Sequence, residues 1–109
     1  MSRHDSLKGA LPLLVLKILL RQGPLHGYGI ASLIQSASDE VLRVEEGSLY
    51  PALHRLEEEG WVKARWVVTD KKRRARVYEI TSAGRKQLES EESRWQAVTV
   101  AVGQVLRRV

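Results

Sequence analysis

The chain has 109 residues, of which 43% are hydrophobic and none is cysteine. This length predicts one globular domain with a modest core, and the lack of cysteine excludes disulfides and thiolate-bound zinc. The net charge of +5 is concentrated in residues 63–76, where seven basic residues and one acid give +6 and leave −1 for the rest of the chain. Such a patch favours a polyanionic partner, and the alternative is a solvated hairpin tip that keeps the protein soluble.

The N-terminal part of the chain predicts a polar tail and a buried helix. Residues 1–7 are polar and are expected to form a frayed tail that includes His4. Residues 8–22 are apolar on nearly every face of a predicted helix, and such a helix is buried on more than one side. In so small a protein, this favours a second copy of the chain as part of its cover. The apolar run contains Lys17 and is too short to span a bilayer, and no leader-peptide cleavage site follows, so we expect a cytoplasmic protein without membrane contact.

A second short helix is predicted for residues 26–36. Gly27 and Gly29 flank Tyr28 at its start and permit the close approach of a neighbouring helix or of a phosphate. We favour helix packing for the two glycines. Residues 39–46 are predicted to be a connector that contains one extended stretch.

The chain is organised around residues 46–60. Leu49, Leu53 and Leu56 recur there at helical spacing and share one face. Pro51 is expected in the first turn, where its missing N–H costs little. The other side of this short helix is polar and partly basic, which is typical of the recognition helix of a winged helix-turn-helix. The side chains on or beside that polar side, which we assign to the major groove of DNA, are Ser48, Tyr50, Pro51, His54 and Arg55.

Several of these side chains have alternative roles. Ser48 is also a candidate helix N-cap, and Tyr50 is a candidate half-core residue with its hydroxyl on a phosphate. His54 lies three residues before Glu57, but two residues without a third ligand make a weak metal site, and no metal is expected. Glu57 and the two glutamates after it repel phosphate, so this end of the helix is expected to point away from DNA.

The second half of the chain predicts a hairpin and a long helix. Residues 62–69 and 76–81 are rich in β-forming residues and flank a charged turn at 70–74, which predicts a β-hairpin, the wing. Thr81 or Ser82 can cap the helix that follows. Its apolar residues are spaced 7, 3, 4, 3 and 4 apart like a coiled-coil seam, which favours pairing with a second copy over folding back. The seam consists of Leu88, Trp95, Val98, Val102, Val105 and Val109.

The predicted fold class is mainly α with a small β-hairpin. A winged helix-turn-helix DNA-binding domain is expected in residues 1–81, and a long C-terminal dimerisation helix in residues 82–109. The alternative function is a winged-helix protein-interaction module without specific DNA binding, and the +6 hairpin argues against it. An enzyme is not expected, because the three histidines lie in the tail, at a helix start and on the recognition face, with no Ser/His/Asp set or paired carboxylates.

Several motifs of the chain resemble the PadR family of bacterial transcriptional regulators, in its short form with a single C-terminal helix. They are HGYGI at 26–30, EGSLYPALHRLE at 46–57, GWV at 60–62, RRARVYEIT at 73–81 and Gly84. The resemblance covers residues 8–88 densely and the last helix by pattern only. It implies a homodimeric winged-helix protein that binds double-stranded DNA at an inverted-repeat operator, usually as a repressor that a small molecule releases. No cofactor is expected.

The resemblance also assigns DNA contacts outside the recognition helix. Tyr28 is similar to the family position where the second helix meets the DNA backbone, and core packing is the alternative. Basic residues on the wing are expected on phosphates or in the minor groove, although Arg76 sits in a strand and has an acidic partner as its alternative. The wing candidates are Lys71, Lys72, Arg73, Arg74 and Arg76.

In some small members of the family, a tryptophan on the last helix faces its twin across the dimer axis and sandwiches planar cationic drugs. Trp95 lies near that position, but we favour dimer packing as its role. No acid follows it on the same face, which argues against a cationic ligand. Trp61 and Trp66 are assigned to the core and the base of the wing. The candidate ligand-binding residues are Leu14, Val15, Trp95, Val98 and Val102, and the candidate dimerisation residues are Leu11, Leu88, Trp95, Val98, Val102, Val105 and Val109.

Overall fold

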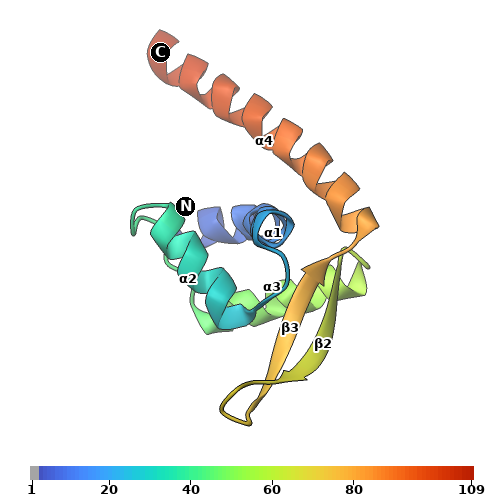
Figure 1. The fold of residues 1–109 in the computed structure, drawn as a ribbon. Helices are drawn as coiled ribbons and strands as arrows, with labels where there is room; N and C mark the ends of the chain where they lie inside the picture. The colour runs from blue at the N-terminus through green and yellow to red at the C-terminus, as the bar shows by residue number, and fades with distance from the viewer. Residues whose placement is uncertain (1–2) are drawn as a thin grey trace.

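Four helices and three short strands make up residues 3–109, the part of the chain that the computed structural model describes. They are α1 (Arg3–Gln22), β1 (Leu25–His26), α2 (Gly27–Ala37), α3 (Glu46–Glu58), β2 (Val62–Val68), β3 (Arg74–Ile80) and α4 (Ser82–Arg108). Figure 1 shows α4 rising away from the body, while the β2–β3 hairpin projects from the opposite side. The molecule is therefore long, with extents of 57 × 28 × 21 Å. The predicted fold class, a winged helix-turn-helix with a long last helix, is confirmed by these elements and their arrangement.

The core forms around α1, which packs against α2, α3, α4 and β3. The helix is buried on more than one side, as predicted, but α4 of the same chain supplies cover that the sequence assigned to a second copy. Leu11 and Val15 of α1 are 1% and 0% exposed, and Leu88 of α4 is 2% exposed. The buried hydrophobic residues include Leu11, Val15, Leu16, Leu19, Ile30, Ile34, Leu49, Leu53, Leu56, Val62, Tyr78, Ile80 and Leu88.

The sheet has the strand order β1-β3-β2 and is antiparallel throughout. The hairpin register runs from Val62 opposite Ile80 to Val68 opposite Arg74. Near the body, the face that carries Val62 and Ile80 is buried, and the same face becomes exposed toward the turn. The wing is therefore anchored by its base and free at its tip. Strand β1 was not predicted from the sequence.

The start of α3 differs from the prediction. The N-cap is Glu45, without a side-chain cap hydrogen bond, and the helix begins at Glu46. Ser48 is therefore the third helical residue, and the N-cap role considered for it is wrong. Pro51 is the sixth residue and lies beyond the first turn, so it leaves the carbonyl of Gly47 without the usual helical donor. Gly47 is exposed, which opens that carbonyl to water.

Two other segments also differ from their predictions. The first helix begins at Arg3, five residues before the predicted start, so residues 3–7 are helical rather than a frayed tail, and residues 1–2 lie outside the described part. The connector after α2 contains no strand. Its backbone turns instead through Asp39 and Glu40, with positive φ angles of 52° and 70°.

The start of α4 is capped as predicted. The Thr81 side-chain oxygen accepts a hydrogen bond from the Gly84 N–H at 3.0 Å, and the Thr81 hydroxyl donates to the Gly60 carbonyl at 2.7 Å. This one side chain therefore ties α4 to the turn that follows α3. Within residues 3–109, no helix has the length and apolar character needed to cross a membrane.

Candidate nucleic-acid interface

The exposed side of α3 carries the residues that the sequence assigned to DNA. Leu49 and Leu53 fix the orientation of the helix by pointing into the core. On the opposite side, Pro51, His54 and Arg55 are exposed, as is Tyr50 in large part, while Ser48 is half-buried. This polar side of α3 is therefore open to a partner along more than two turns.

The glutamates at the end of α3, which were expected to repel phosphate together, have different partners. His54 Nε2 lies 3.4 Å from Glu58 Oε1, one turn further along the helix, rather than beside Glu57. Glu57 instead reaches the wing, where its Oε2 lies 2.7 Å from Arg76 Nη2. Among the described residues, no three His, Asp or Glu side chains gather as a possible metal site.

The first turn of α2 lies next to α3. The His26 Nδ1 caps the helix by accepting a hydrogen bond from the Gly29 N–H at 3.0 Å. A Cβ at Gly27 would lie 3.0 Å from the Tyr50 hydroxyl oxygen, so this glycine permits helix packing as predicted. Tyr28 is 75% exposed, and the alternative that placed it in the core is wrong. Its ring extends the exposed surface of α3 onto α2.

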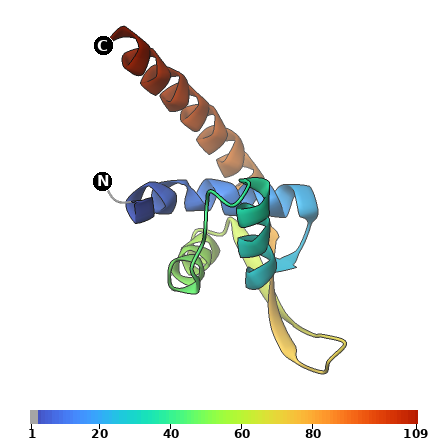
Figure 2. The ribbon, with the colours of Figure 1, turned by 90° about the vertical axis from the view of Figure 1, so that its left-hand side faces the viewer.

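The tip of the wing is strongly basic and fully exposed. Figure 2 shows the hairpin reaching well beyond the body, on the side away from α4. Thr69 closes the turn, because its N–H donates to the Arg73 carbonyl at 2.8 Å and its carbonyl accepts from the Lys72 N–H at 2.9 Å. We call the four exposed basic residues of the turn and the start of β3 the basic tip: Lys71, Lys72, Arg73 and Arg74.

The tryptophan of β2 supports this tip. Trp66 is 55% exposed on the wing rather than packed at its base as predicted. The guanidinium carbon of Arg74 lies 4.7 Å from the centre of its ring, and that of Arg76 lies 5.7 Å away. An aromatic face attracts a guanidinium at these distances. Trp61 packs against the core, as expected.

Arg76 sits between the wing and α3. Its ion pair with Glu57 confirms the alternative in which this arginine has an acidic partner. The Arg76 Nε is buried and has no hydrogen-bond partner among the described residues. Tyr78 lies next to Arg76 and is only 4% exposed. Burial raises the pKa of the Tyr78 hydroxyl, although the neighbouring Arg76 guanidinium lowers it.

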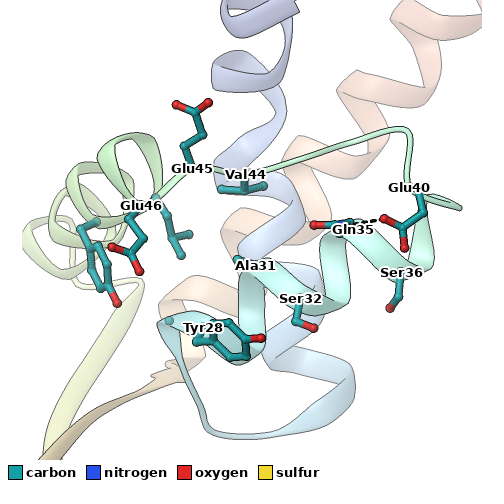
Figure 3. Close-up of a pocket in the computed structure, with 12 residues that line it drawn as sticks. Tyr28, Ala31, Ser32, Gln35, Ser36, Glu40, Val44, Glu45 and Glu46 are labelled. Atoms are coloured by element: carbon teal, nitrogen blue, oxygen red, sulfur yellow. Dashed lines mark hydrogen bonds between the residues drawn. The ribbon is translucent and has the colours of Figure 1, made fainter.

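Two grooves flank the exposed side of α3. The first, of about 630 Å³, lies between α2 and the start of α3, and its lining includes Tyr28 and Ser32 of α2 and, on the other side, Glu45 and Glu46 (Figure 3). Glu40 closes one end of it by accepting a hydrogen bond from Gln35. The second groove, of about 530 Å³, separates α3 from the wing and contains the ion pair of Arg76. Because the first groove is lined by carboxylates, it disfavours phosphate, and the basic surface of this face lies on the wing.

The residues predicted to form the dimer interface divide into two groups. Leu88 and Leu11 are buried in the core of their own chain, so neither presents a side chain to a second copy. Val15 was predicted to line a ligand site, but its side chain is fully buried in the core of this chain. Leu14, predicted for the same site, is half-buried. The remaining seam residues are all exposed, as are Leu106 beside them and Val100 on the opposite face of the helix, neither of which was assigned to the seam from the sequence. The exposed seam residues are Trp95, Val98, Val102, Val105 and Val109.

The chain is similar to known transcriptional regulators over most of its length. Residues 15–90 match the family described as "Transcriptional regulator PadR-like family". The negative transcriptional regulator PadR of Bacillus subtilis is 30% identical over 70 residues, which are 64% of this chain and 38% of that protein. A transcriptional regulator of Mycobacterium tuberculosis is 46% identical over 63 residues, 58% of this chain and 55% of that one. The chain thus spans roughly four to six tenths of the length of these two relatives.

A solved structure agrees over a longer stretch. The structure of a transcriptional regulator from Clostridium thermocellum superposes with a TM-score of 0.83 at 28% identity, and the match covers 92% of this chain and 96% of that one. The similarity therefore includes α4 as well as the helices and strands of the body.

Proposed function

Because the chain belongs to the PadR-like family of transcriptional regulators, we propose that it binds double-stranded DNA as a dimer, through α3 and the wing, and represses transcription from an inverted-repeat operator. The observation that carries the proposal is the basic tip, which projects beyond the body on the side away from α4, where α3 also lies (Figures 1 and 2). A duplex on that side meets α3 and the tip together.

The two elements have different roles in this proposal. The exposed polar face of α3 enters the major groove, where Tyr50, His54 and Arg55 read base edges. The basic tip contacts phosphates and sets the register of the protein on the duplex, and Tyr28 meets the DNA backbone with the exposed part of its ring, at the rim of the carboxylate-lined groove. The Glu57 end of α3 faces the wing rather than the DNA, which suits a helix that enters the groove by its other end.

The dimer in this proposal forms through α4. An exposed stripe of one tryptophan and several valines is an unfavourable surface for an isolated helix, and a second copy buries it along a two-fold axis. Two-fold symmetry in the protein requires two half-sites of opposite orientation, which is an inverted repeat. Trp95 lies on this stripe, and a small aromatic molecule bound beside it at the interface releases the operator. A regulator of this kind works in the cytoplasm.

The proposal is tested by the anisotropy of a labelled duplex taken from upstream of the protein's own gene, with a scrambled duplex alongside, at two salt concentrations. We expect tighter binding to the upstream duplex and a steep fall in affinity with salt, because binding releases counterions from the phosphates. Equal binding to both duplexes would contradict regulation of its own gene. No binding to either would favour the protein-interaction module instead.

The role of the tip is tested by Arg73→Ala/Arg74→Ala. We expect weaker binding to all duplexes and a salt slope flatter by about one to two units. The matched control is Arg107→Ala/Arg108→Ala, which removes the same charge at the far end of α4. A loss confined to the upstream duplex would show that the two wing arginines read bases rather than phosphates.

A further inference from the structure

The structure gives the five candidate basic residues of the wing two different environments. The basic tip consists of exposed residues, and no ion pair joins any of them to a carboxylate among residues 9–109, whose side chains the structure describes. Arg76 is instead bound to Glu57 across the second groove, from a strand of the wing to the last turn of α3. The pair connects the two elements that are proposed to touch DNA.

We propose that Glu57 and Arg76 form a brace that holds the wing against α3 and withholds the Arg76 charge from the DNA backbone, so that the protein prefers its own site over other duplexes. This inference rests on the proposed function, because it concerns how the DNA-binding surface discriminates. It makes Glu57 a positioning residue and removes Arg76 from the set of phosphate contacts.

The guanidinium of Arg76 is held from several sides. Glu57 Oε2 accepts a charge-assisted hydrogen bond from its Nη2 at 2.7 Å, and such bonds are among the stronger ones in proteins. Trp66 lies directly opposite Arg76 in the hairpin register and offers the face of its ring at 5.7 Å. The Nε edge is buried against the protein. Arg76 is therefore already engaged before any duplex arrives.

The charge of the pair explains why it disfavours unspecific contacts. A phosphate that approaches Arg76 also approaches the Glu57 carboxylate, so attraction to one is offset by repulsion from the other. No carboxylate among residues 9–109 pairs with the tip in this way, so the tip attracts any backbone. Fewer available charges mean less sequence-independent affinity, since that affinity comes from phosphate neutralisation.

The brace also fixes the relative position of two DNA-binding elements. Specific binding requires α3 in the groove and the wing on the backbone at the same time. A pre-organised surface loses less freedom on binding than a flexible one, and the gain is greatest where both elements fit together. An unbraced wing still contacts phosphates, but in many positions.

The test is the substitution Glu57→Gln, which removes the carboxylate charge and keeps the size of the side chain. Its matched control is Glu59→Gln, which removes the same charge just beyond α3, from an exposed residue that makes no ion pair in the described part of the chain. We expect Glu57→Gln to steepen the salt slope by about one unit. It should also bind the scrambled duplex several-fold more tightly and lower the ratio between upstream and scrambled affinities. Glu59→Gln should leave the slope and the ratio close to those of the unchanged protein.

A second variant, Arg76→Gln, gives an independent result that does not require changing Glu57. In the otherwise unchanged protein it should leave the salt slope as it was, whereas in the Glu57→Gln background it should return the steeper slope to the original value. A slope that flattens by about one unit on Arg76→Gln alone would show that this arginine contacts phosphate, and would overturn the inference.

A measurement without DNA completes the test. Urea unfolding of the two single variants and the double variant forms a double-mutant cycle, and we expect a favourable coupling between the two side chains. Zero coupling, or a Glu57→Gln protein that binds like Glu59→Gln, would overturn the brace while leaving the proposed function intact. An unchanged protein that binds no duplex would overturn both.

Discussion

The contact between α4 and the turn after α3 makes a sharp prediction for Gly84. This residue is the third of α4 and is buried. A Cβ added there would lie 2.1 Å from the Trp61 carbonyl oxygen and 2.8 Å from Ile80 Cγ1. The same carbonyl accepts a hydrogen bond from the Thr81 N–H at 3.0 Å. The helix and the turn thus pack backbone against backbone, and we predict that Gly84→Ala strongly destabilises the protein.

The magnitude follows from two opposing effects. Alanine in place of glycine in a helix is favourable by about 1 kcal/mol, through its helix propensity. Forcing a methyl group into filled space costs about 1–3 kcal/mol or more, and a separation of 2.1 Å from a backbone atom cannot be relieved by turning a side chain. The helix must move and weaken the hydrogen bond of Thr81, which contributes about 1 kcal/mol. We therefore expect a net loss of about 2 kcal/mol in the free energy of unfolding.

The assay is urea unfolding followed by far-ultraviolet circular dichroism, at one protein concentration, because the stability of the proposed dimer would depend on concentration. The matched control is Gly9→Ala in α1, where a Cβ meets nothing within 4 Å. We expect this control to gain up to about 1 kcal/mol. If Gly84→Ala proves as stable as Gly9→Ala, the close approach of α4 to Trp61 is wrong.

Three further predictions concern the cap, the buried tyrosine and the exposed stripe. Thr81→Ala should cost about 1–2 kcal/mol of unfolding free energy in the same urea assay, because it removes the bonds to Gly84 and Gly60; an unchanged midpoint would show that the cap is unimportant. Burial raises the pKa of Tyr78 above its ordinary 10.0, so the stability due to its neutral form is complete below pH 10.0 and is lost as the pH rises through the raised value. Tyr78→Phe should reduce this alkaline loss, measured as the change in urea midpoint between about pH 9 and about pH 11; an equal loss in both proteins would assign it to another group. If the proposed dimer forms through α4, Val102→Asp should give a monomer in sedimentation and weaken DNA binding, and a dimer that survives would place the interface elsewhere.

Local patterns in the sequence were sufficient to predict much of the fold. The spacing of Leu49, Leu53 and Leu56 determines which side of α3 is apolar, whatever the rest of the chain does, and all three are buried. The hairpin follows from β-forming residues on both sides of a charged turn. Thr81 caps the start of α4 by accepting a hydrogen bond from the N–H of Gly84, three residues later. Each of these features depends on residues a few positions apart.

Features that depend on distant partners were not predictable in this way. Strand β1 has only two residues, too few for any alternation, and it exists because β3 offers a free edge at Val77 and Tyr78. The spacing of apolar residues on α4 predicts an apolar stripe along the helix, but it does not predict which part of the protein covers each residue of that stripe. Leu88 is covered by α1 of its own chain, whereas Trp95, two turns later on the same stripe, is exposed because α4 has by then left the body.

Pairing between distant residues also changes the number of basic side chains that are available to DNA phosphates. Counting residues 63–76 in the sequence gives +6, but two of these seven bases are paired with carboxylates from outside the segment: Arg76 with Glu57, and Lys63 with Glu79 at 3.8 Å. The available charge is then +4. Since each phosphate that a base neutralises contributes about 0.9 to the salt slope, the five remaining bases contribute at most about 4.5 rather than about 6.3. A count of basic residues therefore overestimates unspecific affinity whenever the folded chain brings an acid to a base.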